Sequence, residues 1–105
     1  MKNIFESLID YRPEGFQWDE VKNERNIEKH FIDFDTAIDI FLNPILLKKD
    51  TRRDYGEDRF LALGIARGVV LYVVFADRPD GVIRIISAWK GGSRAERIYR
   101  AALLE

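Results

Sequence analysis

The run VVLYVVFA at residues 69–76 restricts the fold more than any other part of this sequence. All of its side chains are apolar or aromatic, so both faces must be covered, which is typical of a strand inside a sheet. The turn Arg67-Gly68 joins this run to RFLALGIA at 59–66, and a turn around Pro79-Asp80-Gly81 leads on to VIRIISAWK at 82–90. Links this short connect antiparallel strands. We therefore predict three consecutive antiparallel strands with 69–76 in the interior.

Two helices are expected before these strands. Asp19 is a suitable N-cap for a helix over residues 20–30, and residues 16–18 can form a short strand ahead of it. Asp33 or Asp35 can cap a second helix that ends before the Asn43-Pro44 pair.

The predicted fold is completed by one more strand and one more helix. The run ILLKK at 45–49 favours a strand, and Ser93 with Glu96 forms a capping box for a helix over about 93–104. We expect an α+β domain with two N-terminal helices, a four-stranded antiparallel sheet and a C-terminal helix.

The first fifteen residues differ from the rest of the chain. Apolar residues recur there at helical spacing, and Pro13 and Gly15 then interrupt the pattern. We predict that residues 1–15 are an N-terminal appendage with a short amphipathic helix and that residues 16–105 form the domain. The apolar positions of the appendage are Ile4, Phe5, Leu8 and Ile9.

Charge and composition narrow the classes of function. Residues 1–47 carry a net charge of −5, whereas residues 48–105 carry +4. The second half can present a cationic face to a partner, although solvated surface lysines and arginines also explain this charge. The chain has no cysteine, which suits a reducing cytoplasm, and no apolar run approaches the ~20 residues that span a bilayer. No glycine-rich phosphate loop is present, and a single histidine without cysteine makes a zinc site a poor fit.

Three groups of polar residues are candidates for function, and each also has a structural explanation. Lys22, Lys29 and His30 recur at spacings that place them near one another on the helix over 20–30, although a helix dipole also favours a C-terminal histidine. Arg84 interrupts an apolar strand, so it either pairs with a carboxylate or faces a functional groove. Arg97 belongs to a basic flank of the last helix, which can simply be solvated.

Three segments of the sequence resemble the BrnT family, the bacterial ribonuclease toxins of type II toxin–antitoxin pairs. Trp18-Asp19-Glu20-Val21-Lys22, followed by Asn26, Lys29-His30 and Phe34, is similar to the family opening W-D-x-x-K-x-x-x-N-x-x-K-H-G-[VI]-x-F. The segment from Arg59 to Gly64 is similar to E-x-R-x-x-x-[IL]-G, and Arg84-Ile85-Ile86-Ser87-Ala88 with Glu96-Arg97 and Tyr99 is similar to R-I-I-S-A-R-x-A and E-R-x-x-Y. The resemblance covers nearly all of residues 16–100. The chain departs from it at Phe31, Trp89 and Gly91, where the family has glycine, arginine and alanine.

The resemblance implies a RelE-like fold and a metal-independent endoribonuclease without a cofactor. It also implies a BrnA-like antitoxin with a ribbon-helix-helix domain, through which alone the complex binds operator DNA. A toxin dimer is left open. Because RNA cleavage needs proton transfer and charge stabilisation at phosphate, the catalytic candidates are His30, Lys29, Arg84 and Arg97. The candidates for substrate binding are Lys22, Trp89, Glu96 and Tyr99. The alternative is a catalytically degenerate module that retains only antitoxin binding and operon autoregulation, since Trp89 replaces an arginine.

Overall fold

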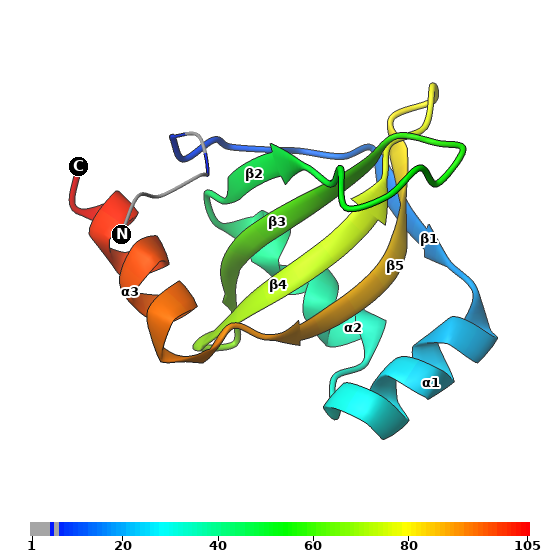
Figure 1. Cartoon of the computed structure of the whole chain (residues 1–105), viewed down its shortest axis with the longest axis horizontal. Helices are drawn as coiled ribbons and strands as arrows, with labels where there is room; N and C mark the ends of the chain where they lie inside the picture. The colour runs from blue at the N-terminus through cyan, green and yellow to red at the C-terminus, as the bar shows by residue number, and fades with distance from the viewer. Residues whose placement is uncertain (1–4, 6) are drawn as a thin grey trace.

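The computed structural model describes residue 5 and residues 7–105, and its centre is one five-stranded sheet (Figure 1). The strand order is β1-β5-β4-β3-β2. The strands are β1 (Gly15–Trp18), β2 (Leu46–Lys49), β3 (Arg59–Ala66), β4 (Val69–Ala76) and β5 (Val82–Lys90). As predicted, β4 lies in the interior of the sheet and pairs antiparallel with both β3 and β5. Arg67 and Gly68 form the tight turn before β4 with φ values of 50° and 82°.

The predicted four-stranded antiparallel sheet with two N-terminal helices is wrong, because the sheet is mixed and has a fifth strand. β1 pairs parallel with β5, with Gly15 opposite Val82 and Trp18 opposite Ile85. The short strand expected at 16–18 therefore belongs to the main sheet. Its partner lies more than sixty residues further along the chain, and local alternation over four residues carries no information about such a pairing.

The helices differ from the prediction mainly at their ends. Helix α1 (Glu20–His30) begins as expected, because the Asp19 carboxylate accepts the Val21 and Lys22 backbone N–H groups. The second helix is α-helical only over α2 (Phe34–Ala37) and continues as the 3₁₀ helix η1 (Ile38–Leu42).

Helix α3 (Gly92–Leu103) starts one residue earlier than predicted, without a side-chain cap. The expected capping box is absent because α3 begins before Ser93 and places it inside the first turn, and Glu96 pairs with Arg100. None of the helices in the described part of the chain is long and apolar enough to cross a membrane.

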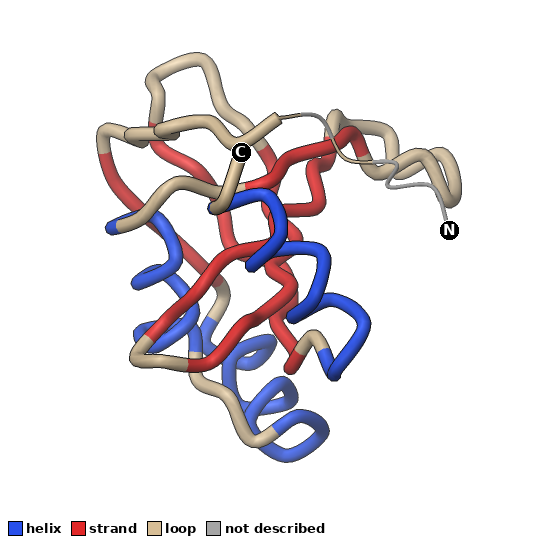
Figure 2. The backbone as a smooth tube through the Cα atoms, turned by 90° about the vertical axis from the view of Figure 1, so that its left-hand side faces the viewer, coloured by secondary structure: helices blue, strands red, loops and turns tan. Residues whose placement is uncertain are grey.

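The sheet is covered on both faces, which explains why β4 is apolar throughout (Figure 2). One face packs against α2 and η1 and forms the larger core, which includes Phe34, Ile40 and Phe75. The opposite face is covered at one end by α3 and is called the α3 face below. Its buried contacts join Leu46, Leu63 and Val70 of the sheet to Ala95, Tyr99 and Ala102 of α3.

The N-terminal segment docks on the domain, but the part of it that the structure describes contains no helix. Ile9 pairs with Ile45 through two backbone hydrogen bonds of 2.9 Å, just before β2. Phe5 and Leu8 pack against the core on the α3 face. The fourth position of the predicted apolar pattern, Ile4, lies outside the described residues. Backbone pairing with Ile45 gives this segment a stable extended form, and the division into appendage and domain stays a prediction.

Candidate functional site

Asn26 fixes α1 to β5 and thereby positions the candidate site. β1 ends at Trp18, opposite Ile85, so the outward backbone groups of Ala88 lie beyond the last strand partner. The buried Asn26 carboxamide satisfies them: Nδ2 donates to the Ala88 carbonyl at 2.9 Å, and Oδ1 accepts the Ala88 N–H at 3.0 Å. Nδ2 also donates to the Ile32 carbonyl at 2.8 Å. One side chain therefore replaces a missing strand partner and ties down the chain that leaves α1.

A pocket of about 240 Å³ lies between α1 and β5. Asn23, on one flank of α1, accepts the Phe34 N–H and faces α2. The cationic residues occupy the other flank, because they lie on the other side of Asn26 at 100° per residue. On β5, the register shifts between Val74 and Phe75, and an extra residue, Ile86, is inserted there as a bulge. The lining residues are Lys22, Arg25, Asn26, Lys29, His30, Ile86 and Ser87.

The cations of this pocket are not neutralised by the protein. Among the described residues, Lys22, Arg25 and Lys29 form neither an ion pair nor a hydrogen bond through their side chains, and no carboxylate lines the pocket. The side chains are exposed at the surface. Several unpaired cations around one hollow attract a polyanion and raise its association rate. The lining of the pocket therefore has the electrostatic character that suits an anion.

An aromatic row continues the site along the α3 face. The His30 ring lies 6.1 Å from the Trp89 ring, and Trp89 lies 5.4 Å from Tyr72, its partner across β4 and β5. The predicted substrate-binding residue Trp89 is thus in contact with the predicted catalytic residue His30. Beside them, Phe31 ends α1 in the left-handed conformation, with φ 61°, and its side chain is 86% exposed.

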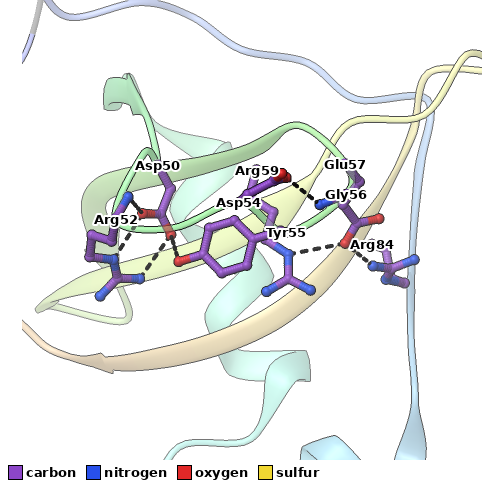
Figure 3. Close-up of polar contacts among 8 residues, drawn as sticks. All are labelled: Asp50, Arg52, Asp54, Tyr55, Gly56, Glu57, Arg59 and Arg84. Carbon is purple, nitrogen blue, oxygen red and sulfur yellow. Dashed lines mark hydrogen bonds and ion pairs between the residues drawn. The ribbon is translucent and has the colours of Figure 1, made fainter.

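Arg84 does not contact His30 or Lys29. Both Arg84 and Trp89 project onto the α3 face, opposite Ala76 and Tyr72, but five positions of β5 separate them. At ~3.3 Å per residue, the distance along β5 between Arg84 and Trp89 is on the order of 15 Å. The Arg84 guanidinium instead donates to Glu57, so the pairing alternative that the sequence left open is the one that the structure contains (Figure 3).

The remaining candidates all lie on α3, and the structure places them differently from one another. Tyr99 is fully buried, and its hydroxyl donates to the Pro44 carbonyl at 2.6 Å, so it packs in the core. Burial also raises the pKa of the Tyr99 hydroxyl. Glu96 is paired with Arg100 at 2.9 Å, whereas Arg97 is exposed and, among the described residues, unpaired. None of the three is in contact with His30.

The loop over residues 50–58 is fixed at its base by a buried carboxylate. The Asp50 side chain is 2% exposed and accepts two bonds of 2.8 Å from the Arg52 guanidinium and one of 3.2 Å from the Tyr55 hydroxyl (Figure 3). The hydrogen bonds from Arg52 outweigh burial and lower the pKa of Asp50 to about 2. The loop is therefore held at the end of the sheet where Arg84 lies.

Sequence reasoning missed Arg25 and Ser87, which line the pocket. The signal for Arg25 was present, because it lies three residues after Lys22 and four before Lys29 and so shares their flank. Ser87 gave no comparable signal, since its position depends on the bulge at Ile86. Asn26 lies between Lys22 and Lys29 in the sequence, but its side chain is buried and holds α1 against β5.

A small α+β domain with unpaired cations beside a row of aromatic rings has features that are typical of proteins that bind nucleic-acid strands. The sequence profile of a family described as "Ribonuclease toxin, BrnT, of type II toxin-antitoxin system" matches residues 18–94. The chain belongs to this BrnT family of ribonuclease toxins. A crystal structure of the ribonuclease toxin BrnT from Brucella abortus superposes with a TM-score of 0.59 and is 27% identical, over 75% of this chain and 97% of that one. No curated protein matches the sequence.

Proposed function

We propose that this toxin is a metal-independent endoribonuclease and that the pocket between α1 and β5 binds the scissile phosphate. The observation that supports this best is the set of unpaired cations Lys22, Arg25 and Lys29 around His30, with no carboxylate in the lining. Guanidinium and ammonium groups suit phosphate oxygens, whereas a divalent metal needs anionic oxygen ligands.

The proposed reaction uses the substrate's own 2′-hydroxyl as the nucleophile. The 2′-oxygen forms a bond to phosphorus while the bond to the 5′-oxygen breaks, which gives a 2′,3′-cyclic phosphate and a free 5′-hydroxyl. The 2′-hydroxyl loses a proton and the departing 5′-oxygen gains one. His30 carries one of these two protons, because imidazole can both accept and donate a proton and the chain has no other histidine, and solvent water exchanges the other. Lys29 and Arg25 stabilise the negative charge that develops on the phosphate oxygens.

Trp89 and Phe31 supply stacking surfaces for the bases next to the cleaved bond. Base–aromatic stacking contributes ~1–3 kcal/mol per base and tolerates different sequences. Arg84 and Arg97, which lie further from His30, are assigned to phosphates outside the cleaved bond.

The test is a cleavage assay on a single-stranded RNA in the presence of EDTA. We expect cleavage by the wild type and a loss of at least a hundredfold in rate for His30→Ala and Lys29→Gln. Lys49→Gln is the matched control. It removes the same charge as Lys29→Gln, but Lys49 lies on β2, at the opposite edge of the sheet. Cleavage that disappears with EDTA and returns with magnesium would contradict the proposal.

We also propose that a BrnA-like antitoxin with a ribbon-helix-helix domain neutralises the toxin in the cytoplasm and supplies the operator-binding part of the complex. The exposed cations of α3, Arg94 and Arg97, make that helix a suitable docking surface for an acidic partner. Tyr99 cannot be its aromatic anchor because it is buried. Reversing both arginine charges should slow association at low salt, and an unchanged rate would place the antitoxin elsewhere.

A second function is favoured by the aromatic row. Trp89 replaces the family arginine and is packed between His30 and Tyr72, so no guanidinium is available at that position. In this alternative the chain is a catalytically degenerate toxin that retains antitoxin binding and operon autoregulation. Wild-type protein without activity, together with activity restored by Trp89→Arg, would support it.

A further inference from the structure

Two arginines converge on a single carboxylate oxygen at the end of the sheet beyond the pocket. Arg59 Nε lies 3.0 Å from Glu57 Oε2, and Arg84 Nη2 donates to the same oxygen (Figure 3). Arg84 and Glu57 are each 30% exposed, so solvent reaches the cluster. The cluster carries two positive charges and one negative charge, and a net positive charge remains after pairing.

The arginines and the carboxylate differ in how firmly they are held. Arg59 starts β3 and its guanidinium lies 4.3 Å from the Tyr55 ring centre, and Arg84 belongs to β5. Both are therefore on the sheet. Glu57 belongs to the loop over 50–58, whose base is fixed by Asp50, and its carboxylate can turn away without breaking a strand.

The position of the cluster relates it to the pocket. Arg84 lies on the same strand as Ile86 and Ser87, which line the pocket, and projects onto the same face as Trp89. An RNA strand that enters the pocket and follows β5 across the α3 face would pass Arg84 a few nucleotides away. A pair of guanidinium groups matches the oxygens of one phosphate.

We infer that Arg59 and Arg84 form a second RNA phosphate site, which Glu57 occupies in the free protein and from which an RNA phosphate displaces it. This inference rests on the proposed function, because it assumes that the substrate is RNA. It assigns Glu57 the role of an internal competitor: weak or single-contact anions fail to displace it, whereas a strand already bound in the pocket does.

The experiment measures binding of a fluorescein-labelled, single-stranded 2′-O-methyl RNA of about 12 nucleotides, which lacks the attacking hydroxyl. Glu57→Gln removes the competing charge, and we expect the dissociation constant to fall by about fivefold. Glu57→Asp keeps the charge but shortens the side chain so that it cannot reach both arginines. It should also tighten binding, which a simple change in net charge cannot explain.

Asp58→Asn is the matched control. Asp58 is in the same loop, pairs with Lys49 at 3.1 Å, and loses the same charge on substitution. We expect less than a twofold effect. In the Arg84→Gln background, Glu57→Gln should no longer increase RNA affinity, because the phosphate site with which Glu57 competes is then absent.

Each result bears on the inference. Weaker binding by Glu57→Gln would mean that Glu57 orients Arg84 and would overturn the inference, as would equal effects of Glu57→Gln and Asp58→Asn. RNA affinity that is unchanged in Glu57→Gln would also overturn the inference. It would favour the alternative in which Arg59 and Arg84 bind a carboxylate of a protein partner. Wild-type protein that binds no RNA would overturn the proposed function as well, whereas the other outcomes leave that function standing.

Discussion

Replacing Asn26 by alanine should cost more stability than any other alanine substitution on α1. The substitution removes three hydrogen bonds and leaves the Ala88 N–H and the carbonyls of Ala88 and Ile32 without partners. Asn26 is only 5% exposed and Ala88 is fully buried, so water cannot replace the lost bonds freely. Removing one partner of a buried hydrogen bond costs at least ~1 kcal/mol, so the loss of three bonds costs about 3 kcal/mol or slightly more. We expect a loss of about 3–4 kcal/mol.

The assay is urea unfolding of the variant and of a matched control, Asn23→Ala. Asn23 is the same residue type on the same helix, but its side chain makes one hydrogen bond, with the Phe34 N–H at 2.8 Å. The control should lose ~1 kcal/mol. For a domain of this size, the difference between the variants corresponds to a fall in melting temperature on the order of 10–20 °C. Hydrogen exchange at the Ala88 amide should also accelerate in Asn26→Ala.

An Asn26→Ala variant that is no less stable than Asn23→Ala would refute the reasoning. It would mean that apolar contacts alone hold α1 in place and that the Asn26 hydrogen bonds add nothing to the free energy of unfolding. RNA binding should decline together with stability, since the cations of the pocket are on the helix that Asn26 positions.

Two further predictions concern the end of α1 and the loop over 50–58. Phe31→Gly should raise the free energy of unfolding by about 0.5–1 kcal/mol, because glycine adopts a φ of 61° without strain and the exposed Phe31 side chain contributes little burial. Phe31→Ala should not stabilise the protein, and thermal melting of the two variants distinguishes these outcomes. Because the pKa of Asp50 is lowered to about 2, its stabilising effect is complete above the ordinary carboxyl pKa near 4 and is lost as the pH falls from ~4 toward 2. The change is about 2 kcal/mol, and an Asp50→Asn variant that shows the same acid transition as the wild type would contradict it.

The features that the sequence predicts correctly are those encoded within one element or one turn. The interior position of β4 follows from its two apolar faces, and the start of α1 follows from the Asp19 cap. The features that it does not predict depend on distant partners. β1 meets β5 only in the folded chain, and Glu57 reaches Arg84 across 27 positions.

The candidate site shows the same division. Lys22, Lys29 and His30 share a pocket because helical spacing alone brings them together. Tyr99 was assigned to the substrate because the family resemblance includes it, yet it lies at the spacing of Ala95 and Ala102, the buried positions of α3. Periodicity within α3 was the better guide there.

The docking of α1 on β5 has a consequence for the order in which the chain can fold during its synthesis. A ribosome releases α1, which carries the cations of the pocket, early, but the Asn26 side chain of α1 bonds to Ala88, near the end of the last strand. The nascent chain therefore cannot assemble its pocket until almost all of it has been translated. At ~5–20 residues per second, this interval lasts several seconds. Until then, the cations of α1 lack the wall that Ile86 and Ser87 of β5 contribute to the pocket.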